Sequence, residues 1–82
     1  MKTSLSAKAR KQLYTLPPPE GLKVGKKLQE LGVNPFAGKL LTGKFKGFYS
    51  LRAWPYRILY EIDKSQQVIT IRVIEHRQGV YK

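Results

Sequence analysis

The side chains of this sequence that could take part in chemistry are mostly basic and lie in its second half. Strands are expected at 48–53, 56–62 and 68–74, since aromatic and β-branched residues are dense there and turn residues separate them. Side chains alternate between the two faces of a strand. One face would carry Ser50, Arg52, Arg57 and Arg72, with His76, Arg77 and Tyr81 just past the sheet. An antiparallel sheet can keep one face in water, so we take this basic face as the working face.

The opposite face of the same strands is predicted to be apolar. It would carry Tyr49, Leu51, Tyr56, Ile58, Tyr60, Ile62, Ile69, Ile71 and Val73. The same alternation puts Ile74 on the basic face, next to Arg72. An apolar face of this size needs a cover, which the first half of the chain must supply.

Two helices are predicted to form that cover. Ser6 can cap the first helix, and its apolar stripe is formed by Ala9, Leu13 and Leu16. The prolines at 17–19 stop this helix and suit the first turn of a second one. The second stripe is Val24, Leu28 and Leu31, and Gly32 is expected to end that helix.

These elements predict an α+β fold in the order β-α-α-β-β-β, within one domain spanning 1–82. A short first strand is expected at 1–5 and a loop at 33–46. The helical hairpin would pack on one face of a small, mainly antiparallel sheet.

The charge of the chain indicates a polyanionic partner. Lys and Arg number 16 against 5 Asp and Glu, which gives a formal net charge of +11. Nucleic acid is the first candidate partner, an acidic protein the second and an anionic membrane surface the third. The alternative is a solvated basic surface without a ligand.

Composition also limits the kinds of site and segment that this chain can form. The chain has no cysteine and one histidine, so we expect neither disulfides nor a metal site, and no cofactor. It has no apolar run of membrane-spanning length, and its first residues lack the apolar core of a signal peptide. A cytoplasmic protein without a membrane partner is therefore expected.

Five segments, taken jointly and in order, resemble the RelE/ParE toxin superfamily of bacterial and archaeal toxin–antitoxin modules. They are AKARKQL at 7–13, LLTG at 40–43, GFYSLR at 47–52, YRILYEI at 56–62 and HRQGVY at 76–81. The family fold has the same β-α-α-β-β-β order. The resemblance implies a type II toxin that is neutralised, in an oligomeric complex, by a small acidic antitoxin with a DNA-binding half.

Two activities are known in this superfamily, and they belong to different classes. The RelE-like branch cuts mRNA, typically in the decoding site of the ribosome. The ParE-like branch inhibits DNA gyrase and is not a nuclease. The arginines and the terminal tyrosine favour a ribosome-dependent endoribonuclease, while Ser50 keeps the gyrase inhibitor as the alternative.

Cleavage of RNA by its own 2′-hydroxyl needs a base, cations at the phosphate and an acid for the departing oxygen. By the resemblance, Arg52, Arg57 and Arg77 would bind the phosphate and stabilise its charge. Tyr81 would stack on a base or orient the nucleophile. For Arg52, the alternative role is a structural bridge to Glu61.

Position 50 departs from the family pattern, because Ser50 stands where active members commonly carry a second basic residue. A loop lysine such as Lys44 or Lys46 could serve as the base, or His76 could, with the right unperturbed pKa for acid–base work. Further RNA contacts are expected from Lys44, Lys46, Ser50 and Arg72. The alternative for Arg72 is a solvated or glutamate-paired side chain.

Overall fold

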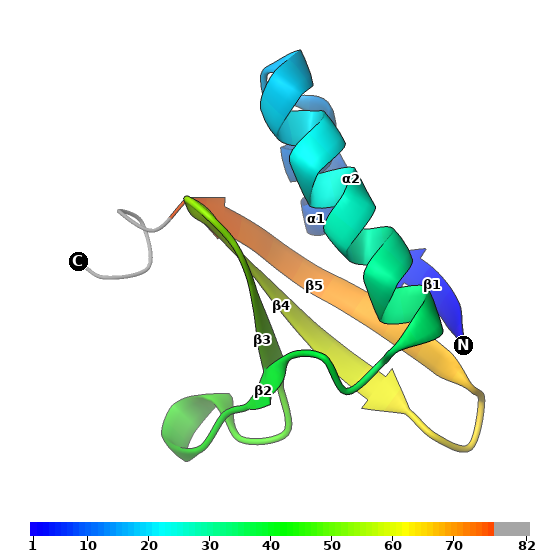
Figure 1. Cartoon of the computed structure of the whole chain (residues 1–82). Coiled ribbons are helices and arrows are strands. Elements are labelled where there is room, and N and C mark those ends of the chain that lie inside the picture. Colours follow the sequence, from blue (N-terminus) through cyan, green and yellow to red (C-terminus); the bar gives the residue numbers. More distant parts are fainter. Residues whose placement is uncertain (77–82) are drawn as a thin grey trace.

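The computed structural model of the chain describes residues 1–76, and Figure 1 shows the path of the chain. Its helices and strands follow the predicted order, with one strand more than expected. They are β1 (Lys2–Leu5), α1 (Ala7–Tyr14), α2 (Pro18–Val33), β2 (Lys39–Leu40), a 3-10 turn (Gly43–Phe45), β3 (Tyr49–Ala53), β4 (Tyr56–Asp63) and β5 (Val68–His76). The predicted α+β class is thereby confirmed.

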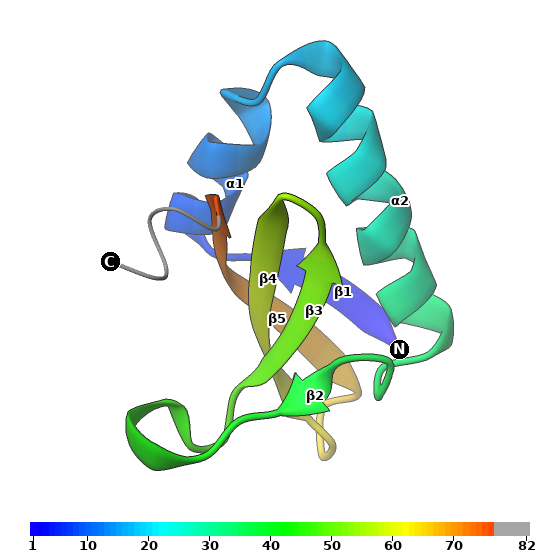
Figure 2. The ribbon, with the colours of Figure 1, turned by 60° about the vertical axis from the view of Figure 1, so that its left-hand side comes forward.

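All five strands form one sheet in the order β1-β5-β4-β3-β2 (Figure 2). β1 runs parallel to β5, and the other neighbouring pairs are antiparallel. The prediction of an unbroken loop at 33–46 was wrong, since Lys39 and Leu40 pair with Ser50 and Tyr49. A strand of two residues is too short to show a period in the sequence.

The first helix begins as predicted. The Ser6 hydroxyl accepts a hydrogen bond from the Ala9 N–H at 3.1 Å, so it caps α1. The second helix ends later than predicted, because its hydrogen bonds continue until the Asn34 N–H donates to the Glu30 carbonyl at 2.7 Å. Gly32 is instead helical, and a Cβ there would lie 3.7 Å from the Met1 carbonyl. Within residues 1–76, no helix is long and apolar enough to cross a membrane.

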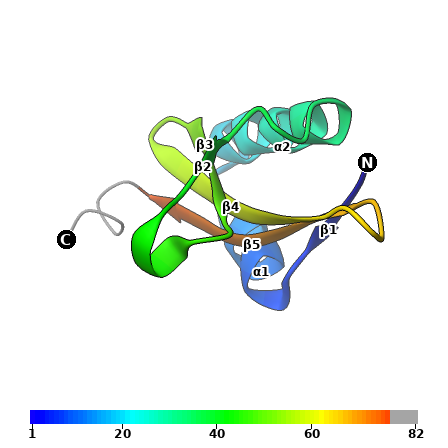
Figure 3. The same cartoon turned by 90° about the horizontal axis from the view of Figure 1, so that it is seen from below.

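The core lies between α2 and one face of the sheet (Figure 3). We call this the helix-side face. From α2 come the buried Val24, Leu28 and Leu31, as predicted from its stripe. The strands contribute buried Ala53, Tyr56, Ile58, Tyr60, Ile69, Ile71 and Ile74. α1 adds buried Ala9 and lies beside the second half of β5, where the Gln12 side chain accepts a hydrogen bond from the Ile74 N–H at 2.8 Å.

A β-bulge in β5 changes which residues share a face. Leu59 pairs with Val73 and the next residue, Tyr60, pairs with Ile71, so Arg72 is an extra residue between them. The prediction that Val73 faces the core and Ile74 the basic side was therefore wrong. Ile74 is 3% exposed in the core, while Val73 shares the opposite face with Leu59.

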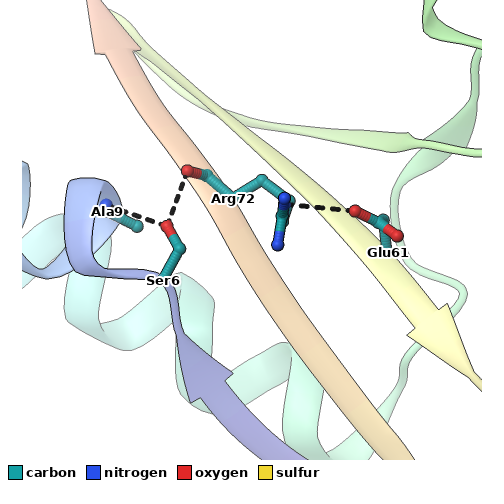
Figure 4. Close-up of polar contacts among 4 residues, drawn as sticks. All are labelled: Ser6, Ala9, Glu61 and Arg72. Atoms are coloured by element: carbon teal, nitrogen blue, oxygen red, sulfur yellow. Dashed lines mark hydrogen bonds and ion pairs between the residues drawn. The ribbon is translucent and has the colours of Figure 1, made fainter.

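The start of α1 and β4 both hold this bulge (Figure 4). The Ser6 hydroxyl donates to the Arg72 carbonyl at 2.8 Å, while still capping α1. The Arg72 guanidinium lies 3.2 Å from the Glu61 carboxylate. Ser6 thus joins the start of α1 to the bulge. The bulge in turn determines to which face of the sheet each of residues 73–76 points.

Candidate functional site

The face of the sheet away from α2, which we call the open face, carries the predicted site in two neighbouring rows. Directly opposite residues of paired strands point to the same face. One row is Arg52, Arg57 and Glu75, on β3, β4 and β5. The next row is Lys39, Ser50, Leu59 and Val73, on β2 to β5.

A hollow of about 660 Å³ opens over β2, β3 and β4 on this face. Its polar lining comes from Lys39, Thr42, Ser50, Arg52 and Arg57. Arg52 is exposed and Arg57 is half-buried. The hollow therefore offers several hydrogen-bond donors and positive charges to an anion.

A second hollow, of about 340 Å³, adjoins the first at Arg57 and Leu41. It is also lined by Lys8, Phe45, Leu59, Val73 and Glu75. Leu59 is only 7% exposed, whereas Phe45 is 44% exposed. The open face thus combines a cationic part with an apolar part.

The 3-10 turn that carries Phe45 depends on two glycines with positive φ. Gly43 begins the 3-10 turn with φ +71° and Gly47 follows it with φ +93°. Glycine adopts positive φ without steric cost, so these positions let the chain turn sharply beside the open face. Lys44 and Lys46 are exposed on the same turn.

The structure brings three of the predicted residues together. Ser50, Arg52 and Arg57 line the same hollow, as the alternation predicted. Arg72 forms an ion pair with Glu61, which was its alternative role. Glu61 is therefore engaged by Arg72, and the alternative of a bridge from Arg52 to Glu61 is not what the structure shows.

His76 lies on the other side of the sheet. It pairs with Tyr56 across the strands, and the two rings meet edge-on with centroids 5.3 Å apart. Tyr56 is a helix-side residue whose hydroxyl donates to the Glu20 carboxylate, and this bond raises the pKa of Tyr56. His76 is therefore apart from the Arg52–Arg57 row. Arg77 and Tyr81 lie outside the described residues.

Sequence reasoning left Lys39, Glu75 and Lys8 out of the site. Lys39 was placed in a loop, and its strand is too short to be recognised from a pattern. Glu75 would have pointed to the core without the bulge, which puts it opposite Arg57 instead. Lys8 comes to the site because α1 lies beside β5. Of these, only Lys39 had a signal, namely its place directly before the family-like segment at 40–43.

A buried tyrosine supports the open face from behind. The Tyr60 hydroxyl donates to the Pro35 carbonyl and accepts from the Gly38 N–H, each at 2.9 Å. Burial raises the pKa of Tyr60, and the bond from Gly38 acts against this. Pro35 and Gly38 belong to the segment that leads into β2. The Tyr60 hydroxyl therefore connects the core to the strand that carries Lys39.

Metal binding has no support in the described part of the chain. Among residues 1–76, no three His, Asp or Glu side chains are grouped as ligands for an ion. The donors that converge on the open face are cationic, and they suit an anionic ligand.

Comparison of the sequence with known proteins identifies a matching family. The family model for the ParE toxin of type II toxin–antitoxin systems, parDE, matches residues 4–81. Toxin RelG of Mycobacterium tuberculosis is 33% identical over 76 residues, covering 90% of this chain and 87% of RelG.

Solved structures show the same fold. A chain of the toxin–antitoxin complex RelBE2 from Mycobacterium tuberculosis has a TM-score of 0.86 and 31% identity, covering 93% of this chain and 96% of that chain. A chain of the intact E. coli RelBE complex has a TM-score of 0.76 and 23% identity, covering 92% and 94%. At the lower identity, the likeness concerns the fold alone.

Proposed function

The chain belongs to the ParE toxin family of type II toxin–antitoxin systems, within the RelE/ParE superfamily, and we propose that this toxin is a ribosome-dependent endoribonuclease that cleaves mRNA. The proposed substrate-binding surface is the open face. The chain would act in the cytoplasm, without a cofactor.

The direct pairing of Arg52 with Arg57 is the observation that carries this proposal. Like charges directly opposite each other in a sheet are destabilising, so such a pair is poorly explained by stability. The next residue in the row is Glu75, which lies directly opposite Arg57 and carries a single negative charge. A phosphate group placed between the guanidiniums would remove the repulsion and gain charge-assisted hydrogen bonds.

The proposed reaction uses the nucleophile of the RNA itself. The 2′-hydroxyl loses its proton and attacks the neighbouring phosphorus, the bond to the 5′-oxygen breaks, and that oxygen takes up a proton. Arg52 and Arg57 would stabilise the negative charge that grows on the phosphate during attack. We propose Arg77 and Tyr81 as further site residues, on the family resemblance alone.

The apolar part of the open face suits a nucleobase. Phe45 is partly exposed beside Leu41, Leu59 and Val73 in the second hollow. Stacking of a base on an aromatic side chain is worth about 1–3 kcal/mol. A nucleotide could therefore place its phosphate at the arginines and its base near Phe45.

Inhibition of DNA gyrase is the second candidate function. The matching family model is that of the ParE toxin, and Ser50 replaces a basic residue common in active RNA-cleaving members. A gyrase inhibitor would need no base or acid at the open face.

An antitoxin is the proposed protein partner. The chains similar to this one include members of the RelBE2 and RelBE toxin–antitoxin complexes. A net charge of +11 favours an acidic partner on electrostatic grounds.

Primer-extension mapping of a defined mRNA in a reconstituted translation system tests the proposed reaction. Cuts within codons that need both ribosomes and the protein, and that disappear in Arg57→Gln, are expected. An intact message with the wild-type protein, together with loss of DNA supercoiling by gyrase, would favour the second candidate function.

A further inference from the structure

We infer that Lys39 acts together with Arg52 and Arg57 as a phosphate-binding cation of the open face, and that the buried Tyr60 hydroxyl holds Lys39 in place. This inference rests on the proposed function, since it assigns Lys39 to RNA phosphate binding at the open face. Lys39 would be a substrate-binding residue and Tyr60 a positioning residue.

The register places Lys39 beside Ser50. The two residues are directly opposite in the β2–β3 pair, so their side chains point to the same face with Cβ atoms about 4.5–5.5 Å apart. Serine is short and leaves space above it, which the longer lysine can use. The ammonium of Lys39 can thereby occupy the region that a basic side chain at position 50 would fill.

The hollow distinguishes Lys39 from the other candidate lysines. Lys39 lines the same hollow as Arg52 and Arg57. Among the described residues, Lys44 and Lys46 line neither of the two hollows of the open face. Lys8 lines the second hollow and not the first.

The position of Lys39 depends on an anchor in the core as well as on its pairing with Ser50. β2 has only two residues, so its own ladder is short. Directly before it, the Gly38 N–H donates to the Tyr60 hydroxyl, and that hydroxyl donates to the Pro35 carbonyl. Tyr60 is 0% exposed, so it offers a rigid support.

Gly38 shows how close this contact is. A Cβ at Gly38 would lie 2.5 Å from the Tyr60 hydroxyl and 2.9 Å from the Ser50 carbonyl, so no side chain fits there. The backbone before Lys39 therefore rests directly on Tyr60 and on β3. A shift of this backbone would move Lys39 relative to Arg52 and Arg57.

Binding of a short single-stranded RNA, measured by fluorescence anisotropy across a salt series, tests the role of Lys39. We expect Lys39→Gln to weaken binding about tenfold and to reduce the salt slope by about 0.7, the loss of one phosphate contact. Lys39→Arg should restore most of the affinity. Lys26→Gln, with the same charge change on exposed α2, should weaken binding less than about twofold.

A double-mutant cycle tests Tyr60. Tyr60→Phe keeps the ring in the core and removes only the hydroxyl that holds Pro35 and Gly38. We expect RNA binding about threefold weaker in the wild-type background and unchanged in the Lys39→Gln background, because Tyr60 acts through Lys39. Equal losses in both backgrounds would show a general structural effect and overturn the positioning role.

The outcomes for Lys39 and for RNA cleavage are separable. If the wild-type protein cleaves mRNA but Lys39→Gln binds RNA like Lys26→Gln, the inference is overturned and the proposed function stands. A tenfold loss in Lys44→Gln without a loss in Lys39→Gln would also overturn it. If the wild-type protein binds RNA through Lys39 without cutting it, the proposed function fails and Lys39 remains the assigned cation.

Discussion

The two faces of the sheet differ in which polar groups lie next to each other. On the helix-side face, the hydroxyls of Tyr56 and Tyr60 are each bonded, one to Glu20 and the other to Pro35 and Gly38. In the described part of the chain, no buried side-chain nitrogen or oxygen lacks a partner. On the open face, Arg52 and Arg57 lie directly opposite each other.

This difference indicates that the helix-side face serves stability and the open face serves binding. The helix-side face follows the rules of a stable interior, with apolar packing and satisfied hydrogen bonds. The open face breaks a rule of sheet stability by pairing like charges. Local departures from stability of this kind are expected at functional sites. Variants on the two faces should therefore separate stability from function.

A substitution in the core of the helix-side face should cause a large loss of stability. Ile58→Ala removes a side chain that is 0% exposed and should lower the free energy of unfolding by about 2–5 kcal/mol. Urea unfolding measures this change. Leu22→Ala, at a site on α2 that is 71% exposed, is the control and should change it by less than about 0.5 kcal/mol. Similar losses in both variants would contradict the assigned core.

The next effect is on activity at the open face. Arg57→Gln should lower the rate of RNA cleavage about 10²–10³-fold, because one group that stabilises the phosphate charge is lost. Its free energy of unfolding should stay within about 0.5 kcal/mol of the wild type. Single-turnover cleavage and urea unfolding measure the two quantities. Arg10→Gln, exposed on α1, is the matched control. Undiminished cleavage in Arg57→Gln would remove Arg57 from the site.

A smaller effect is expected where α1 joins the sheet. Ser6→Ala removes both the cap of α1 and the hydrogen bond to the bulge carbonyl of Arg72. The free energy of unfolding should fall by about 1–2 kcal/mol. Ser4→Ala, exposed on β1, is the control. If thermal or urea unfolding did not distinguish Ser6→Ala from Ser4→Ala, the bulge would not depend on this serine.

The smallest effect is a gain of function on the open face. Glu75 lies opposite Arg57 and opposes the binding of a polyanion. Glu75→Gln should therefore tighten RNA binding about threefold at low salt, and the gain should shrink as salt screens the charge. Anisotropy titrations with Glu30→Gln on α2 as the control measure this difference. Weaker binding by Glu75→Gln would instead show that Glu75 supports the site.

The sequence predicted most of the fold because its patterns are local. The stripes of the two helices and the alternation of β3 and β4 follow from residue spacing, and the structure confirms them. The bulge at Arg72 could not be predicted, because its support comes from residues distant in sequence: the Ser6 hydroxyl donates to the Arg72 carbonyl, and the Gln12 side chain accepts from the Ile74 N–H. That single extra residue exchanges the faces of residues 73–76, so it brings Glu75 to Arg57 and separates His76 from it.

The candidate site was only partly predictable for the same reason. Ser50, Arg52 and Arg57 lie on regular strands, and alternation was enough to group them. Lys39 joins them through a two-residue strand, and the residue before it, Gly38, is held by Tyr60, 22 positions further along the chain. Such a contact between segments far apart in sequence has no periodic signal.

The most direct test of the open face as the RNA-binding face is an NMR titration of methyl groups with a short single-stranded RNA. The methyl groups of Leu59 and Val73 lie on the open face, while those of Ile58, Ile71 and Ile74 lie on the helix-side face. The signals of Leu59 and Val73 should shift with added RNA, while those of the three isoleucines stay in place. Shifts confined to the isoleucines would contradict the assignment of the open face.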